Sequence, residues 1–444
     1  MFGDAFHADP AAIFRRLRAQ HGPIAPVLLA EGVPAYLVLD HSTMAEILRD
    51  ERNWTRDSRL WTGWASGRVG PDSELAPMMQ HRKNVLFAGG EMHTRLRKAV
   101  CDSLATVDER TLERHIRTVA IRLIDSFAAD GAADLVTQYA MLMPLLTFNQ
   151  LFDLDPTDGD RLLEALRRIW DGDDAAQANA TYQHILQTLL HRKRAWPAAD
   201  ITSALLRHPA ALSDEELLEH LVLIIGAGNA PTADLIGNAL SLLLTDGQVG
   251  REVAGARLSV RDAIDQALWL HCPMQAYPFV YARSAQRIGN LTIPQGAAVA
   301  MGLAAANLSV VEQMTGPMPL NRAYVSFGVG RHHCPGDKIA LKIAEIAIEE
   351  LRSRLPTLAL AIPTDAVAWR QSLFARAVAA LPVVFSAATT SHYSLQEGSS
   401  WMPGPSPSTP LPPPSGTSTS RPSGSATTAR SSLWSFLTAW WRGR

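Results

Sequence analysis

The spacing of apolar and polar positions predicts a chain that is mostly helical, with a few short strands. Helical periodicity covers residues 11–20, 91–105, 108–128, 159–170, 180–193, 261–270 and 336–354. Extended segments are predicted at 24–29 and 34–39, joined as a hairpin, and at 279–285, 291–293, 298–302 and 381–385. The predicted fold class is therefore mainly α with small β-sheets.

Two capping boxes mark predicted helix starts, Thr43-x-x-Glu46 and Ser213-x-x-Glu216. The second opens a long apolar helix that runs to about Leu244. Two glycines and a proline lie near its middle, namely Gly226, Gly228 and Pro231. Because glycine and proline weaken helices, we expect an interruption at this point.

The composition changes near residue 386. Residues 387–431 are dominated by Ser, Thr, Pro and Gly, which bury too little apolar area to offset the entropy of ordering, and they are expected to be a disordered linker. Residues 432–444 place Trp434, Leu437 and Trp441 at helical spacing beside basic residues. We therefore expect a globular domain over 1–386, a linker, and a short amphipathic aromatic and basic segment at 432–444.

The charge and the cysteines exclude several function classes. With 41 Lys and Arg against 43 Asp and Glu, the net charge of −2 gives no electrostatic drive toward nucleic acid. The three cysteines, Cys101, Cys272 and Cys334, lie far apart, which argues against a disulfide scaffold and a structural zinc site. No secretion signal and no spanning helix is found in the sequence, so a cytoplasmic location is expected.

One of these cysteines lies in a loop suited to a thiolate. Residues 326–336 contain three glycines and a proline around Cys334, and a helix is predicted to begin directly behind it. The helix N-terminus favours negative charge on the sulfur, and a thiolate is one of the few groups that hold haem iron. A buried free cysteine fits the same residues. A zinc site is disfavoured, because the adjacent His332 and His333 cannot complete a tetrahedral shell.

The motif Phe327-x-x-Gly330-x-x-x-Cys334-x-Gly336 resembles the haem-binding signature of the cytochromes P450. The resemblance extends from about Phe6 to Phe385 and implies an α-rich triangular prism, with haem b between the long central helix and the cysteine loop. Cys334 would be the axial ligand of the iron. The other residues implied to contact haem are His93, Arg97, Arg283, Phe327, Gly328, Arg331, His332, Gly336, Ala227 and Gly228.

The resemblance also implies an activity. The implied protein is a haem-thiolate monooxygenase that hydroxylates a small, largely hydrophobic molecule with O2 and two electrons. A ferredoxin and a ferredoxin reductase would supply the electrons. A basic face for the ferredoxin is expected at Arg95, Lys98, Arg331, Lys338 and Lys342. The residues implied to line the substrate pocket are Trp61, Trp64, Gly226, Phe279 and Phe374.

The long helix departs from the family pattern where the family places an acid followed by an alcohol. Those positions are Ala230 and Pro231, and neither side chain can donate a proton. Asn229 and Thr232 are candidate substitutes, although Thr232 is rotated by about 100° on an ideal helix. The four residues form the expected catalytic segment, and a peroxide-using variant of the reaction would depend less on the missing pair.

A second departure lies in the helix over 261–270. The family's Glu-x-x-Arg pair is replaced by Gln266 and Trp269, so that Arg322 loses its usual carboxylate, for which Asp265 and Gln266 are candidate replacements. A neutral pair need not cost stability, since buried ion pairs barely offset their desolvation. In this feature the chain resembles an actinobacterial subgroup of the family.

These departures keep a second class of function open. The alternative is a catalytically atypical haem-binding sensor, or a component of a membrane-associated signalling complex. The aromatic and basic segment 432–444 would then make weak contact with a bilayer, at the inner face of the membrane, or with a partner protein.

Overall fold

The computed structural model describes residues 3–387, except 71–72, 74, 156, 160, 163, 166–174 and 316–320. Its α-helices are α1 (Asp4–Ala8), α2 (Pro10–His21), α3 (His41–Arg49), α4 (Thr62–Ala65), α5 (Ala76–Met79), α6 (Gly90–Leu104), α7 (Glu109–Asp125), α8 (Leu142–Leu151), α10 (Ala175–Ala195), α11 (Ile201–Arg207), α12 (Asp214–Thr245), α13 (Gly247–Ala254), α14 (Val260–Leu270), α15 (Leu303–Val311) and α16 (Asp337–Arg354). Short helical turns lie at Ser58–Leu60, Val136–Ala140, Gly330–His332 and Thr364–Ala366. The structure is therefore mainly helical, as the sequence predicts.

The strands are short and form three small sheets. They are β1 (Ile24–Ala30), β2 (Val33–Val38), β3 (Trp54–Thr55), β4 (Ala132–Asp134), β5 (Phe279–Ala282), β6 (Gln286–Ile288), β7 (Leu291–Ile293), β8 (Ala298–Met301), β9 (Ala359–Leu360) and β10 (Pro382–Val384). The largest sheet has the order β1-β2-β8-β5-β3, with the predicted hairpin β1–β2 at its edge and β2 parallel to β8. The other two are β4-β10-β9 and β6-β7.

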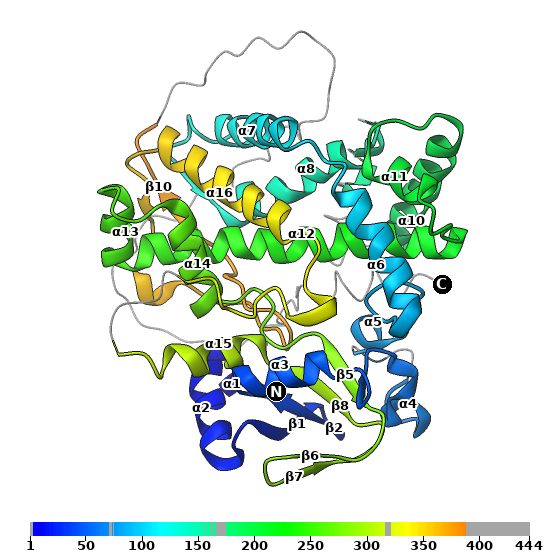
Figure 1. The fold of residues 1–444 in the computed structure, drawn as a ribbon. Coiled ribbons are helices and arrows are strands. Elements are labelled where there is room, and N and C mark those ends of the chain that lie inside the picture. Colours follow the sequence, from blue (N-terminus) through cyan, green and yellow to red (C-terminus); the bar gives the residue numbers. More distant parts are fainter. Residues whose placement is uncertain are drawn as a thin grey trace, which may run out of the picture.

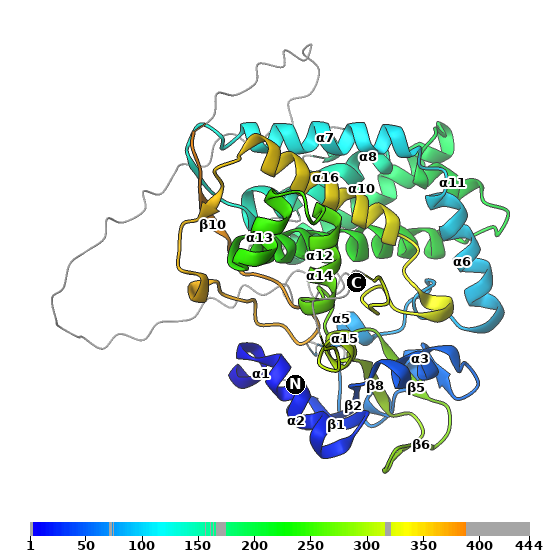
Figure 2. The same ribbon diagram turned by 60° about the vertical axis from the view of Figure 1, so that its left-hand side comes forward.

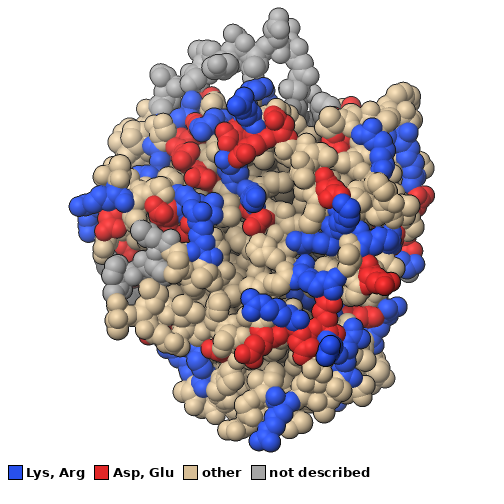
Figure 3. Space-filling model, in the orientation of Figure 1, with Lys and Arg blue, Asp and Glu red and all other residues tan. Residues whose placement is uncertain are grey.

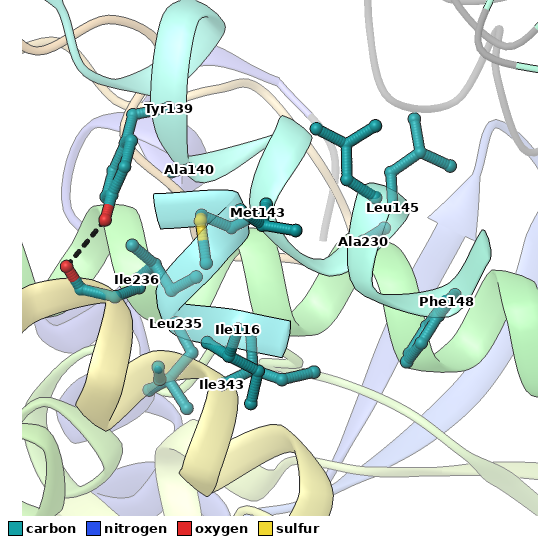
Figure 4. Packing of buried hydrophobic residues seen from close by; sticks show 14 of the residues in the cluster. Ile116, Tyr139, Ala140, Met143, Leu145, Phe148, Ala230, Leu235, Ile236 and Ile343 are labelled. Atoms are coloured by element: carbon teal, nitrogen blue, oxygen red, sulfur yellow. Dashed lines mark hydrogen bonds between the residues drawn. The ribbon is translucent and has the colours of Figure 1, made fainter. Parts of the chain in front are cut away.

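Helices and the largest sheet occupy different parts of the molecule. Figures 1 and 2 show this sheet at one end of the molecule, beneath α3 and α15, while α12 crosses the middle of the helical part. Helices α7, α8 and α16 pack together with α12 around the main core. In that core the hydroxyl of Tyr139 donates a hydrogen bond to the carbonyl of Ala347 at 2.7 Å, among apolar side chains such as Ile116 and Ile236 (Figure 4).

Two helix predictions are corrected by the structure. Helix α3 begins at His41, because the Asp40 side chain accepts from the backbone N–H of Thr43 and caps the helix three residues before the predicted cap at Thr43. Helix α12 is continuous through Pro231, since the packing of the flanking turns compensates for the single backbone hydrogen bond that proline removes. The capping box of Ser213 and Glu216 is confirmed.

Parts of the sequence prediction lie outside the described residues. These parts are the linker and amphipathic segment predicted at 387–431 and 432–444, beyond Ala387, and much of the predicted helix at 159–170. No helix in the described part of the chain combines the length and the hydropathy that a membrane span requires.

Candidate functional site

The loop that carries Cys334 is held in a tight backbone turn. The N–H of Cys334 donates to the carbonyl of Phe327 at 2.8 Å, and that of Gly328 donates to Val325 at 2.7 Å. Gly328 and Gly330 have φ values of 71° and 74°, which favour glycine because other residues are strained there. A Cβ at Gly330 would also lie 3.2 Å from the carbonyl oxygen of Leu48. The glycines of the motif are therefore required by the shape of the loop.

The sulfur of Cys334 lies at the start of α16 and faces a cavity. Burial raises the pKa of the Cys334 thiol to about 11, although backbone N–H groups of Gly336 and Asp337 hydrogen-bond to the sulfur and lower it. The amides thus prepare the sulfur for negative charge, but the surroundings do not ionise it by themselves. A positively charged metal centre is the group that would complete this arrangement.

Asn307 on α15 fixes the loop from behind. Its side-chain amide donates to the carbonyl of Leu268 at 3.0 Å and to the hydroxyl of Ser326 at 2.9 Å. Its side-chain oxygen accepts from the N–H of Val325 at 2.9 Å. Asn307 is fully buried, so these bonds are shielded from water and join α14, α15 and the loop.

Asp265 takes the role that the missing glutamate would have. Its carboxylate accepts from Nε of Arg322 at 2.9 Å, from the hydroxyl of Tyr324 at 2.9 Å and from Nε of Arg261 at 3.0 Å. Trp269 donates from its indole N–H to the carbonyl of Asn321 at 3.2 Å. Of the two candidate replacements, the structure therefore places Asp265 against Arg322, while Gln266 is buried on α14.

A cluster of positively charged and hydrogen-bond-donating side chains lies beside the loop. Arg56, His93, Arg97 and His332 line one cavity together with Cys334, and the rings of His93 and His332 are 4.0 Å apart. Neither ring nitrogen of His93 nor Nη1 of Arg56 has a hydrogen-bond partner among the described residues, although all three atoms are buried. The cluster therefore lacks the acceptors that its donors require.

The electrostatics of this cluster are those of a site prepared for an anion. Burial, followed by the charges of Arg331, Arg97 and Arg56, lowers the pKa of His93 to about 4. Burial and the same neighbouring cations lower the pKa of His332 well below its usual value, and burial lowers the pKa of Arg56 to about 10. An acidic group bound here would relieve this mutual repulsion.

Arg56 is a member of the cluster that sequence analysis missed. It follows the two-residue strand β3, and the short segment around it gives no motif from which its role could be inferred. The signal available in the sequence is weak: one arginine between Thr55 and Asp57. Its full burial is visible only once β3 pairs with β5.

The other two predicted arginines lie farther out. Arg331 pairs with Glu51 at 2.5 Å and donates to the hydroxyl of Thr94, so that it joins the loop to the turn after α3 and to α6. Arg283 is exposed after β5 and lines a smaller cavity of about 120 Å³, which it shares with Arg56 and His332. Both therefore lie at the rim of the cluster.

The main cavity lies between α12 and the cysteine loop. It has a volume of about 330 Å³. Its floor includes Cys334 and Phe327 of the loop and Ile339 of α16, and its far wall is largely apolar. The apolar wall includes Leu151, Phe152, Leu223, Ile224, Leu235 and Phe374. Such a cavity suits an apolar ligand with few polar groups.

The predicted pocket residues divide into two groups. Gly226 and Phe374 line the cavity, as expected. Phe279 packs behind Phe374 with ring centroids 5.8 Å apart, and does not line the main cavity. Trp61 and Trp64 pack against each other in the core beneath the sheet, where Trp61 also meets Tyr281. Their size and apolar character are used in that core, so their assignment to the pocket is corrected.

Comparison with known proteins gives a consistent result. No family model matches the chain. Vitamin D(3) 25-hydroxylase of Pseudonocardia autotrophica is 29% identical over 395 residues, covering 86% of this chain and 95% of that protein. Cytochrome P450 107B1 of Saccharopolyspora erythraea is 27% identical over 405 residues, covering 86% and 96%. The solved structure of CYP154C4 from a Streptomyces species superposes with a TM-score of 0.78 at 26% identity, covering 86% and 98%.

The chain has the fold of a cytochrome P450 and is similar to cytochromes P450 over 86% of its length. Cytochromes P450 are haem-thiolate oxidoreductases, and the residues of this chain fit haem on structural grounds. The cavity brings the thiol of a glycine-rich loop together with Arg56, His93, Arg97 and His332, which match an iron atom and the two propionates of one haem. Among these four residues, Arg56 and His93 carry buried polar atoms that have no hydrogen-bond partner in the described part of the chain. Haem, when bound, supplies the iron at which dioxygen is activated.

The middle of α12 forms the side of the cavity that faces the cysteine loop. Ala227, Gly228, Ala230, Pro231 and Thr232 line the cavity. A Cβ at Gly228 would lie 2.6 Å from the ring of Phe148, so the absence of a side chain lets that ring pack against the helix. Asn229 is not among the lining residues, and its side-chain oxygen is buried without a partner among the described residues.

A further acid on α12 was missed by sequence analysis. Asp234 lines the cavity, is 6% exposed, and forms an ion pair with Arg370. Burial raises the pKa of Asp234 to about 6, although the charge and hydrogen bond of Arg370 lower it. The sequence placed Asp234 outside the expected catalytic segment, and its partner is 136 positions away.

Proposed function

We propose that this cytochrome P450 hydroxylates a small, largely hydrophobic molecule, inserting one oxygen atom of O2 and reducing the other to water. The overall reaction consumes two electrons and two protons with each O2. The observation that carries the proposal is the apolar cavity that opens directly onto the Cys334 thiol. Relatives named as hydroxylases, such as 6-deoxyerythronolide B hydroxylase of Saccharopolyspora erythraea, at 27% identity, support the reaction type.

Each part of the site has a distinct task in this proposal. Cys334 would ligate the iron, and the N–H groups of Gly336 and Asp337 would stabilise the negative charge on its sulfur. Arg56, His93, Arg97 and His332 would bind the propionates. Arg283 lines the adjoining smaller cavity, and Arg331, paired with Glu51, would add positive charge beside it. Phe327, which lines the cavity with Cys334, would pack against the cofactor near the sulfur. The apolar wall would exclude water and hold the substrate in the cavity beside the cysteine loop.

The electrons are proposed to come from a ferredoxin and its reductase. The basic face expected for docking is largely neutralised in the structure: Arg95 pairs with Glu216, Lys98 with Asp102, and Lys342 with Glu109 and Glu113. Figure 3 shows positive and negative groups mixed over this view of the molecule. Because basic side chains already paired with acids attract an acidic ferredoxin only weakly, we expect the affinity of docking to depend modestly on ionic strength.

The alternative, a haem-binding sensor or a component of a membrane-associated complex, has no support among the relatives named above. The apolar cavity favours a substrate-binding enzyme. The division of the chain into a haem domain over 1–386 and the segments 387–431 and 432–444 remains a prediction. Removing residues 388–444 tests it, since β10 ends at Val384 and the haem spectrum should survive the deletion.

The decisive experiment is the absorption spectrum of the reduced protein with carbon monoxide, followed by titration with apolar compounds. We expect a red-shifted Soret band typical of thiolate ligation and a spin-state shift when a compound fills the cavity. Cys334→Ala should abolish the band, whereas Cys101→Ala, on α6, should leave it unchanged. An unchanged band in Cys334→Ala would refute the ligand assignment. Absence of turnover with both O2 plus reductant and peroxide would refute the proposed reaction.

A further inference from the structure

Asp234 lies on α12 about one helical turn after Ala230 and Pro231, the two positions that lack an acid and an alcohol. On an α-helix each residue turns by about 100° and rises by about 1.5 Å. Viewed down the helix axis, the Asp234 side chain therefore lies about 40° from that of Ala230 and about 60° from that of Pro231. Along the axis, Asp234 is roughly 6 Å from Ala230. Asp234 therefore lies on the helix face between the two missing side chains. Thr232 projects about 160° away from Asp234.

The surroundings of Asp234 hold its side chain while leaving one oxygen available. Arg370 binds Oδ1, and the side chain is 6% exposed. Oδ2 is buried and has no hydrogen-bond partner in the described part of the chain. Because a buried carboxylate oxygen without a partner is costly, Oδ2 is stabilised by carrying a proton or by contacting a water in the cavity that Asp234 lines.

The small residues before Asp234 leave room for such a water. Ala230 has a single methyl group, and Pro231 has no N–H with which to close the helical hydrogen bond at Ala227. The carbonyl of Ala227 is thereby available to a hydrogen-bond donor next to the cavity. A water bonded to this carbonyl and to Oδ2 would connect Asp234 with the space above the cysteine loop.

We propose that Asp234, held by Arg370, is the proton-donating acid of this cytochrome P450, in place of the acid and alcohol missing at Ala230 and Pro231. The inference rests on the proposed function. In each turnover Asp234 gives one proton from Oδ2 through water toward the reacting oxygen and recovers one from solvent. The electrons come from the ferredoxin, so that Asp234 itself is neither oxidised nor reduced.

The primary test compares wild type with Asp234→Asn, which keeps the shape and the contact with Arg370 but cannot donate an acidic proton. We expect O2-dependent product formation to fall by about 100-fold, the typical contribution of a general acid. Release of peroxide per electron pair and the solvent isotope effect should rise. Turnover driven by added hydrogen peroxide should stay unchanged, because peroxide brings its own protons.

Two further variants separate proton donation from a structural role. Asp200→Asn is the matched control, since Asp200 is equally buried and pairs with Lys193 at 2.8 Å away from the loop. It should leave the ratio of product to peroxide unchanged. Placing Ala230→Asp and Pro231→Thr in the Asp234→Asn background should restore O2-dependent turnover, because the acid and alcohol return to the positions they occupy in the family.

A readout independent of turnover is the infrared absorption of the carboxyl group. In the haem-loaded, substrate-free protein, a C=O band of a protonated buried carboxyl should titrate with a midpoint near the pKa of about 6, and Asp234→Asn should remove it. Arg370 is the charged group that faces Asp234. The inference would be overturned if Asp234→Asn turned over substrate with O2 as fast as wild type, or if wild type lacked the infrared band. Absence of turnover in wild type would instead refute the proposed function.

Discussion

Arg322 donates a hydrogen bond from Nε to Oδ2 of Asp265 at 2.9 Å, although Asp265 lies one residue before the position of the family glutamate. The side chain of Asp265 is 4% exposed and also accepts bonds from Tyr324 and Arg261. The carboxylate that anchors the segment before the cysteine loop has thus moved by one residue along α14. Trp269 fills the space beside it and packs edge-on against Tyr324.

Asp265→Asn should therefore weaken the support of the loop. Three hydrogen bonds to a buried carboxylate are replaced by weaker bonds to an amide, and we expect a loss of about 2 kcal/mol in the free energy of unfolding. Haem should also dissociate faster. Urea unfolding and haem transfer to an acceptor protein measure the two effects. Glu312→Gln, which removes the more exposed pairs with Arg15 and Arg18, is the control; equal effects in both variants would contradict the special role of Asp265.

Arg56→Gln should have opposite effects on the haem-free and haem-loaded protein. Removing a buried positive charge whose Nη1 has no hydrogen-bond partner among the described residues should stabilise the haem-free protein. Haem should bind about tenfold or more weakly, because a charged hydrogen bond is lost. Thermal unfolding with and without haem and haem titration provide the measurements. Arg59→Gln, at an exposed pair with Asp57, should change neither. A parallel loss of stability in both forms would show a purely structural role for Arg56.

Gly302→Ala should be strongly destabilising. A Cβ at this position would lie 2.2 Å from the carbonyl oxygen of Val38, at the junction of β8 and α15 with β2. The backbone of a central strand cannot give way cheaply, so we expect a cost of about 3 kcal/mol or poor expression. Gly70→Ala, where a Cβ meets no atom within 4 Å, should be neutral. If Gly302→Ala were as stable as wild type, the backbone of Gly302 would not lie as close to the Val38 carbonyl as the structure places it.

The stability of the protein should depend on the protonation of Asp234. Because burial raises its folded pKa from 3.8 to about 6, the folded state binds more protons between these values and stability falls as pH rises through them. The size of the effect is on the order of 3 kcal/mol. His271, whose pKa burial lowers to about 4, acts in the opposite sense, so the informative quantity is the difference between wild type and Asp234→Asn.

Chemical denaturation of both proteins from about pH 4 to about pH 7 gives that difference. Wild type should lose stability relative to Asp234→Asn as the pH rises through this window, and the difference should be constant above it. A difference that does not vary with pH would mean that the pKa of Asp234 is the same in the folded and the unfolded state, so that burial does not raise it.

Local sequence patterns predicted much of the fold. The hairpin β1–β2, the capping box of α12 and the helix behind Cys334 depend on neighbouring residues, and all three are present. The prediction that α12 is interrupted was wrong, because tertiary packing holds the helix together through Pro231. The same limit applies to Trp61 and Trp64, whose aromatic character suits a pocket and a core equally well.

The sequence by itself determined the cysteine loop, since the glycines and Cys334 lie within a few positions of one another and their backbone requirements are local. It also showed that Ala230 and Pro231 cannot donate a proton. Only the tertiary structure decided which groups replace the missing ones. Asp234 meets Arg370 across 136 positions, and Arg56 joins His93 and His332 only when β3 pairs with β5. The pKa and charge state of an acid or an arginine depend on its burial and on its charged neighbours. Both are decided by contacts between segments that are distant in the sequence.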